Sequence, residues 1–148
     1  IGDGSERDRL ERAAKGTGRD IRFTGWLPRD QVLAWMRHAT LLVFPSYGPE
    51  SLSRVLLEAC VFGLPVAAMD TGGTGDIILH EQTGLLSSTV DQLGVDIGRL
   101  RHDRNLRQRF GCAAQEHVDA TFSSRVVMRE IESLYERICE ESSQGLIG

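Results

Sequence analysis

An apolar strand, a polar loop and a helix follow one another in the stretch that decides the fold, Thr40-Leu41-Leu42-Val43-Phe44-Pro45-Ser46-Tyr47-Gly48-Pro49-Glu50-Ser51-Leu52-Ser53-Arg54-Val55-Leu56-Leu57-Glu58-Ala59. The apolar run predicts a buried strand over residues 41–44, and the pattern after the loop predicts a helix over residues 52–62. In α/β proteins, a loop that leads from a strand to a helix N-terminus is where anionic ligands bind. The stretch therefore predicts both a fold class and the place of a ligand site.

Two glutamates mark this site, Glu50 in the loop and Glu58 in the helix. They can bind the hydroxyls of a sugar and a ribose while the helix end between them holds phosphates. Glu58 stands in an otherwise apolar helix, where burial of an unpartnered carboxylate is costly. A solvated helix face, or a pair with Arg54 in the weaker Arg-before-Glu orientation, explains Glu58 about as well as a ligand does.

The rest of the chain alternates between strand and helix patterns, which predicts an α/β fold with a Rossmann-like parallel sheet and flanking helices. Ser5 is expected to cap the first helix, and Gly63 is expected to end the helix that carries Glu58. In the helix from Asp30, the expected buried side holds Val32, Leu33, Trp35 and Met36. The predicted strands cover residues 21–24, 65–69 and 83–87; the predicted helices cover residues 5–15, a segment from residue 30, 76–79, and most of the chain from residue 89.

The composition suits one domain of 148 residues and excludes several classes of protein. A net charge of −4 argues against a nucleic-acid binder, which usually shows a basic face. The cysteines at 60, 112 and 139 and the histidines at 38, 80, 102 and 117 show no metal-ligand spacing and no disulfide framework. We therefore expect no metal, no cofactor, and mostly buried thiols in a reducing compartment, the cytoplasm.

Glycines also occur in the turns after other predicted strands, at Gly2-Asp3-Gly4, Gly25 and Gly72-Gly73. Gly2-Asp3-Gly4 lacks the third glycine of a dinucleotide motif, so a tight strand-to-helix turn is favoured. Gly72-Gly73 is either a plain turn or a close approach of backbone to ligand. Trp26, after Gly25, either flanks a nucleobase or covers the edge of the domain. The Gly2-Asp3-Gly4 turn is expected at the carboxyl edge of the sheet, and the Gly72-Gly73 loop is expected on the same edge as the Glu50 loop.

The C-terminal segment, residues 123–141, predicts an amphipathic helix. Val127, Ile131, Leu134 and Ile138 fall on one face of it. Packing of this face on its own domain is the favoured interpretation, and docking of a partner chain or of a missing domain is the alternative.

An ordered set of motifs resembles the donor half of retaining GT-B glycosyltransferases, specifically glycosyltransferase family 4, or glycosyl transferases group 1. The set covers nearly the whole chain: Gly2-Asp3-Gly4-x2-Arg7, Phe23-x-Gly25, Glu50-x7-Glu58, Ala59-Cys60-x2-Gly63-Leu64-Pro65-Val66-Ala67-Ala68-x2-Thr71-Gly72-Gly73 and Gln82-Thr83-Gly84-Leu85-Leu86. The resemblance implies a domain that binds a nucleotide-diphosphate sugar, usually without a metal, and transfers the sugar to a hydroxyl with retention of configuration.

The resemblance also implies roles for residues. Glu50 is the expected catalytic residue and contacts the donor sugar, while Glu58 contacts the ribose. The remaining expected donor-binding residues surround the phosphates and the base: Gly4, Gly25, Trp26, Leu27, Gly48, Ser51, Leu52 and Ser53.

This chain departs from the family pattern in two ways. Leu52-Ser53 stands where the family has Phe-Gly, although Ser53 can still cap the helix or bind a phosphate. The first strand and helix, with their diphosphate-binding Arg and Lys, and the N-terminal acceptor domain are absent. We therefore expect one partial domain of a longer protein, which alone binds donor weakly and does not transfer sugar. The missing domain would take the acceptor glycan, lipid or small molecule, and it would decide between a cytoplasmic and a peripheral inner-membrane location.

Two other functions remain open at this point. One is a catalytically idle nucleotide-binding or assembly module, and the other is a same-fold sugar-nucleotide epimerase. A phosphorylase would need a lysine for pyridoxal phosphate, and Lys15, the single lysine of the chain, stands at the end of a predicted helix.

Overall fold

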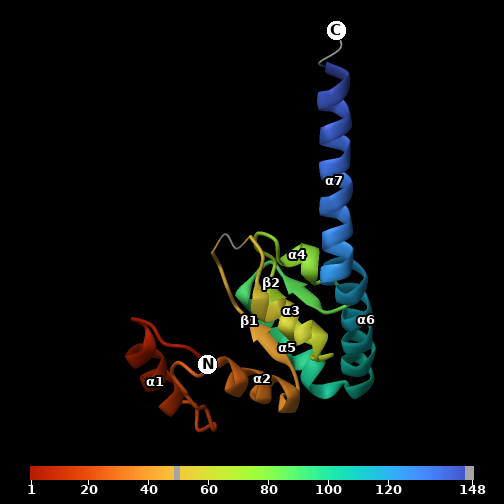
Figure 1. Cartoon of the computed structure of the whole chain (residues 1–148). Coiled ribbons are helices and arrows are strands. Elements are labelled where there is room, and N and C mark those ends of the chain that lie inside the picture. The colour runs from red at the N-terminus through yellow and green to blue at the C-terminus, as the bar shows by residue number, and fades with distance from the viewer. Residues whose placement is uncertain (49–50, 146–148) are drawn as a thin grey trace. The chain divides into compact units, whose positions relative to one another are not determined.

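The computed structural model describes residues 1–48 and 51–145, with side chains as far as Ser142. The chain divides into two compact units, Ile1–His38 and Ala39–Gly148. The helices and strands of each unit are labelled in Figure 1.

The first unit contains two helices, α1 (Arg7–Lys15) and α2 (Arg29–His38). The strand predicted over residues 21–24 is wrong: the pairing seen here is an isolated antiparallel bridge in which Gly2 N donates to Gly25 O at 2.9 Å. One short neighbour cannot satisfy the backbone groups of a whole strand, so residues 21–24 stay irregular.

Two finer predictions in the first unit are also corrected. The residue that caps α1 is Glu6, with no side-chain capping bond, and not Ser5. The Arg7 amide donates instead to Gly4 O at 3.1 Å, so the backbone turn before α1 takes over part of the capping. On α2, Met36 is buried as predicted, but Trp35 is 51% exposed.

The second unit is built on a parallel three-stranded sheet, which confirms the predicted α/β class. Its strands are β1 (Leu42–Phe44), β2 (Val66–Met69) and β3 (Leu85–Ser87), in the order β1-β2-β3. Leu42 pairs with Val66, and Ala67 pairs with Leu85. Helix α3 (Arg54–Val61) joins β1 to β2, and the short helix α4 (Thr74–Ile77) lies between β2 and β3, two residues earlier than predicted.

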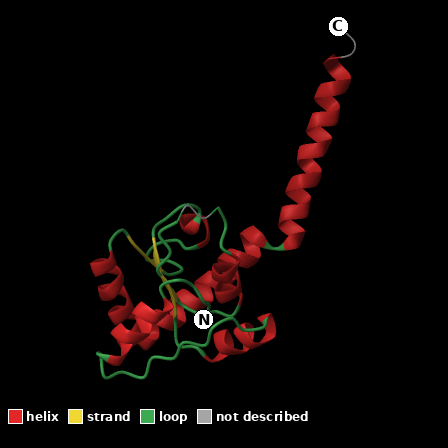
Figure 2. Cartoon of the chain, turned by 90° about the vertical axis from the view of Figure 1, so that its left-hand side faces the viewer, coloured by secondary structure: helices red, strands yellow, loops and turns green. Residues whose placement is uncertain are grey.

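Helices cover both faces of the central strand, as Figures 1 and 2 show. All four residues of β2 are buried, and alternate residues point to opposite faces. One face packs on α5 (Val90–His102) and α6 (Arg104–Phe122), while α3 contacts β2 from the other. The core on the α5 side consists of Ala67, Met69, Leu85, Leu93, Leu100 and Phe110.

Helices α3 and α6 meet at two glycines. Gly63 ends α3 as predicted, with a φ of 64° that favours glycine. Gly111 of α6 lies so close to the Gly63 carbonyl that a Cβ on Gly111 would overlap it. Gln115 Nε2 donates to Val61 O at 2.9 Å and satisfies a carbonyl at the C-terminus of α3. The close packing of α3 on α6 therefore depends on the absence of a side chain at 111.

The last helix, α7 (Ser124–Gly145), continues from α6 and extends away from the sheet (Figures 1 and 2). Val127, Ile131, Leu134 and Ile138 are between 37% and 48% exposed. The favoured expectation, that this face packs on its own domain, is therefore wrong for the part of the chain described. No helix within that part is long and apolar enough to cross a membrane.

The cysteines differ from the expectation of mostly buried thiols. Cys60 is buried on α3, but Cys112 and Cys139 are exposed, and no disulfide joins these three residues. Burial raises the pKa of the Cys60 thiol from 9.0 to about 11. Its thiolate, the reactive form, is thus scarce at neutral pH.

We expect a thiol reagent at pH 7.5 to modify two cysteines of the native protein, Cys112 and Cys139, within minutes. Cys60 should react only after denaturation, because burial both raises its pKa and blocks the reagent. Mass spectrometry of the labelled peptides, with and without guanidinium, measures this. Fast native labelling of Cys60 would contradict the burial of α3 against the sheet.

Candidate functional site

The candidate site of the second unit is formed by two loops that leave neighbouring parallel strands. Residues 45–53 follow β1, and residues 70–73 follow β2. Both loops therefore begin at the carboxyl edge of the sheet, the edge at which α/β proteins bind ligands. The predicted proximity of the Gly72-Gly73 turn and the Glu50 loop is confirmed for the described residues of both.

The two loops touch at two points. Thr71 Oγ1 donates a hydrogen bond to Ser46 O at 3.2 Å. Gly73 lies so close to the carbonyl oxygen of Ser51 that a Cβ at position 73 would overlap it. At the start of the second loop, Asp70 N donates to Ser87 O at 2.9 Å and joins it to β3.

The first loop ends at the N-terminus of α3, where Ser53 is the N-cap residue. Ser53 has extended backbone angles, φ −88° and ψ 111°, and its side chain makes no capping hydrogen bond. Its carbonyl accepts from Leu56 N at 3.2 Å and Leu57 N at 3.3 Å. The first amides of α3 have no intrahelical acceptors, so this helix end can bind an anion.

The predicted site residues of this unit occupy the loop and the helix after it. Gly48, Ser51 and Leu52 are exposed, and Ser53 is buried. Glu58 is half-buried within α3. Glu50, the predicted catalytic residue, lies outside the described residues.

The other predicted site residues belong to the first unit, where Gly25 is bridged to Gly2, two residues before Gly4. The bridge between Gly2 and Gly25 places the turn before α1 beside the loop of residues 23–27. Gly25 is buried with a φ of 66°, Leu27 is half-buried, and Trp26 is 81% exposed. The indole therefore covers no edge within its own unit.

Arg7 organises this region, and analysis of the sequence assigned it no role. Its guanidinium bonds Glu11 at 2.8 Å, Asp3 at 3.1 Å and the Phe23 carbonyl at 3.4 Å. The hydrogen bonds to Glu11 and Asp3 raise the pKa of Arg7. Asp3 and Glu11 each lie four residues from Arg7 in the sequence. Opposite charges commonly pair at this spacing, so it could have predicted the two ion pairs of Arg7. Arg7, Asp3 and Phe23 border a hollow of about 440 Å³ that is lined also by Gly2 and Gly4.

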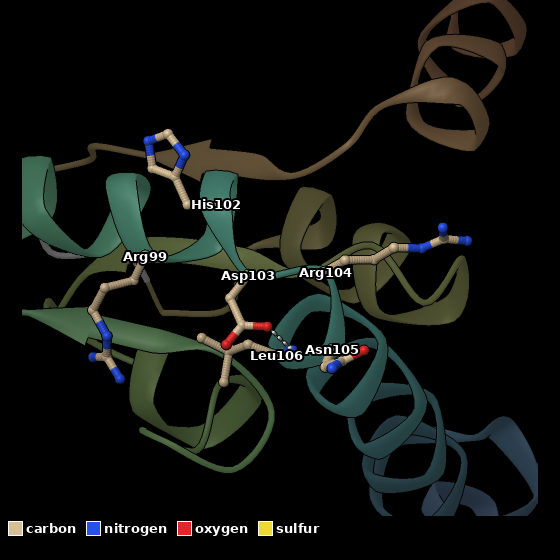
Figure 3. Close-up of a pocket in the computed structure, with 6 residues that line it drawn as sticks. All are labelled: Arg99, His102, Asp103, Arg104, Asn105 and Leu106. Atoms are coloured by element: carbon tan, nitrogen blue, oxygen red, sulfur yellow. Dashed lines mark hydrogen bonds between the residues drawn. The ribbon is translucent and has the colours of Figure 1, made fainter.

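A second hollow, of about 620 Å³, lies at the turn between α5 and α6 and is rich in basic residues. Figure 3 shows that Arg99, His102 and Arg104 point in different directions, while Asp103 caps α6 by accepting from Leu106 N. Arg99 pairs with Glu81, which raises the pKa of Arg99 and lowers that of Glu81. These side chains do not converge on one ligand, so this hollow is not the candidate site.

The candidate site offers a helix N-terminus that can bind an anion, with Glu58 half-buried on the same helix. Among the described residues, no group of three or more His, Cys, Asp or Glu side chains could hold a metal ion. A parallel α/β sheet with such loops at its carboxyl edge defines a nucleotide- or sugar-phosphate-binding class of protein.

Comparison with known proteins identifies the family within this class. Residues 1–117 match the family described as "Glycosyl transferases group 1", and the chain belongs to that family. It is 37% identical over 124 residues to sulfoquinovosyl transferase SQD2 of Arabidopsis thaliana, covering 80% of this chain and 24% of that protein. It is 32% identical over 146 residues to D-inositol 3-phosphate glycosyltransferase of Corynebacterium jeikeium, covering 96% of this chain and 34% of that protein.

Solved structures show the same fold, that of GT-B glycosyltransferases. Sucrose-phosphate synthase from Thermosynechococcus elongatus superposes with a TM-score of 0.79 at 28% identity, over 95% of this chain and 36% of that one. HepE of Anabaena, solved in complex with UDP-glucose, superposes with a TM-score of 0.73 at 22% identity, over 89% and 38%. The chain thus spans little more than a third of the length of either structure.

Proposed function

We propose that this chain is the donor-binding part of a retaining glycosyltransferase, which transfers a sugar from a nucleoside diphosphate to an acceptor hydroxyl. One observation carries the proposal: in a member of this family, two loops meet at the carboxyl edge of a parallel sheet and one of them leads into the N-terminus of α3. Such a helix end attracts the diphosphate of the donor through its unpaired amides and its dipole.

We assign the roles in the order in which the donor lies along the loop and helix. Glu50 binds hydroxyls of the transferred sugar, Glu58 binds the ribose, and the amides of Leu52 and Ser53 bind the diphosphate. Gly48 and Ser51 line the rest of this site in the second unit. In the first unit, we assign the loop of Gly25, Trp26 and Leu27 to the base of the donor, and Gly4 is a further donor-binding residue.

The reaction breaks the bond between the anomeric carbon and the diphosphate oxygen and forms a bond from that carbon to the acceptor oxygen on the same face. The acceptor hydroxyl gives its proton to the departing diphosphate oxygen as this bond forms. Negative charge develops on the leaving diphosphate, so hydrogen-bond donors aimed at it lower the barrier. A helix N-terminus contributes about 0.3–1 kcal/mol per favourable charge, and up to ~2 kcal/mol where it is partly buried.

The proposed reaction also requires an acceptor site and basic groups that bind the diphosphate. The acceptor binds to a part of the enzyme that precedes these residues, and that part also supplies basic groups for the diphosphate. No metal is required, because α3 and those basic groups neutralise the diphosphate. Two exposed thiols, Cys112 and Cys139, suit a reducing compartment such as the cytoplasm.

Replacement of Glu58 by alanine is expected to weaken binding of the nucleoside diphosphate about tenfold or more, because hydrogen bonds to a charged group contribute roughly 1.5–3 kcal/mol. Isothermal titration calorimetry with UDP, GDP and ADP and their glucose conjugates, with and without EDTA, measures this. Glu116, an exposed glutamate of α6, provides the control E116A, which should bind like wild type.

Two results would contradict the proposal. Equal affinities of wild type and E58A would remove Glu58 from the site. Loss of binding in EDTA would show that a metal ion is required.

A second candidate function, an assembly module without transferase activity, is favoured by one observation. The apolar face of α7 is exposed, as expected of a surface that docks another chain. Substitution of Glu50 separates the two functions, because only the transferase requires that carboxylate.

A further inference from the structure

Few interactions hold the loop between β1 and α3. Tyr47 is 65% exposed and Leu52 is 45% exposed, so neither side chain anchors the loop in the core. Between described residues, positions 45–48 and 51–52 make one hydrogen bond, the one that the Thr71 hydroxyl donates to Ser46 O. Ordering of any part of this loop on ligand binding would cost conformational entropy.

Thr71 is well placed to reduce that cost. It stands two residues after β2, whose residues are all buried, and the neighbouring amide of Asp70 is bonded to Ser87 O of β3 at 2.9 Å. The Thr71 side chain is itself half-buried. Its hydroxyl is therefore carried by a rigid part of the unit, while the carbonyl that it binds belongs to the loop that leads from β1 to α3.

A second contact, between Gly73 and Ser51, fixes the other end of the same loop. The backbone of Gly73 lies directly against the carbonyl of Ser51, two residues before the N-cap of α3. The loop is thus held near its start by a hydrogen bond and near its end by steric contact, and both contacts come from residues 71–73. A substitution of Thr71 by valine removes the hydrogen bond and keeps the shape of the side chain. The contact of Gly73 can be changed only by adding a side chain there.

We propose that Thr71 is a positioning residue for the donor. By holding Ser46, its hydroxyl keeps the loop in the conformation that presents the amides of Leu52 and Ser53 to the diphosphate. Thr71 itself touches neither the sugar nor the nucleotide. This inference rests on the proposed function, because it concerns the loop that is assigned there to the donor.

The test uses the complete enzyme and three variants. Thr71→Val keeps the shape and removes the hydroxyl, whereas Thr71→Ser keeps the hydroxyl. Thr17→Val is the matched control, since the Thr17 hydroxyl also donates to a backbone carbonyl, that of Ala14 at 2.7 Å, but in the first unit. Amide hydrogen exchange without nucleotide reports how firmly residues 46–53 are held, and calorimetry with UDP, GDP and ADP reports binding.

We expect Thr71→Val to speed exchange in residues 46–53 about two- to tenfold and to weaken nucleotide affinity by a similar factor, the range of one neutral hydrogen bond. Thr71→Ser should restore both quantities to within about twofold, and Thr17→Val should change neither. Exchange in β2 should be the same in all variants, which separates this effect from general destabilisation.

Other outcomes of these experiments would each contradict one part of the proposal. Unchanged loop exchange in Thr71→Val, or a Thr71→Ser variant as impaired as Thr71→Val, would show that the hydroxyl does not hold the loop. Faster exchange with unchanged affinity would show that holding the loop does not position the donor. Failure of the wild-type enzyme to bind any of the three nucleotides or their sugars would overturn the proposed function, while the exchange result would still decide whether Thr71 holds the loop.

Discussion

Replacement of Glu50 by alanine in the complete enzyme is expected to abolish sugar transfer and to leave nucleotide affinity within about twofold of wild type. The reason is that we assign Glu50 to the sugar, whose bonds change in the reaction, and not to the nucleotide. Loss of one group that stabilises a transition state typically costs ~10²–10³ in rate. Initial rates with a radiolabelled nucleotide sugar, together with calorimetry on the nucleoside diphosphate, measure both quantities.

The comparison with E58A makes this prediction specific. E50A should lower the rate at saturating donor, whereas E58A should mainly raise the donor concentration needed for half-maximal rate. A matching loss of nucleotide affinity in both variants would contradict the division of roles. A rate for E50A within threefold of wild type would favour a protein in which this site does not perform transfer.

Replacement of Gly111 by alanine is expected to destabilise the second unit by about 1–3 kcal/mol, the cost of forcing a methylene group into a filled space. The new methyl group would overlap the Gly63 carbonyl, which is backbone and cannot rotate away. Helices α3 and α6 would have to separate, and the bond from Gln115 to Val61 O would be strained with them. Chemical denaturation followed by circular dichroism measures the change in free energy of unfolding.

Gly98→Ala is the matched control for this prediction. Gly98 is also in a helix, α5, but a Cβ there meets no atom within 4 Å. Alanine has a higher helix propensity than glycine, so G98A should stabilise the protein by up to about 1 kcal/mol. If G111A were as stable as wild type, the close approach of α6 to Gly63 would be wrong.

Analysis of the sequence predicted the second unit better than the first, for a physical reason. The strands of the second unit are apolar runs bounded by Gly, Pro or Ser, and burial on both faces of a parallel sheet requires that composition. Residues 21–24, Ile-Arg-Phe-Thr, alternate between apolar and polar residues, and in place of a neighbouring strand there is one bridge, from the adjoining Gly25 to Gly2. The local pattern of residues indicates a tendency to form a strand, but a strand forms only where a neighbouring strand pairs with it.

The candidate site divides in the same way. The order of Ser53, the helix and Glu58 could be predicted, because a strand, loop and helix in succession place a helix N-terminus at the edge of a sheet. The role of Arg7 was missed, although its spacing to Asp3 and Glu11 is local. Thr71 could be placed near the site but not assigned a partner, because Ser46 is 25 residues away in the sequence.

The α/β class, the helix end at the carboxyl edge and the membership of a family of glycosyltransferases follow from the order and periodicity of residues along the chain. The contacts between loops, the glycines that lie against a backbone carbonyl and the apolar faces that are covered depend on how the folded chain brings distant segments together. The apolar face of α7 has the periodicity of a packed helix and is nevertheless exposed. Periodicity reports that a face can be buried, but burial itself depends on what the rest of the fold brings against that face.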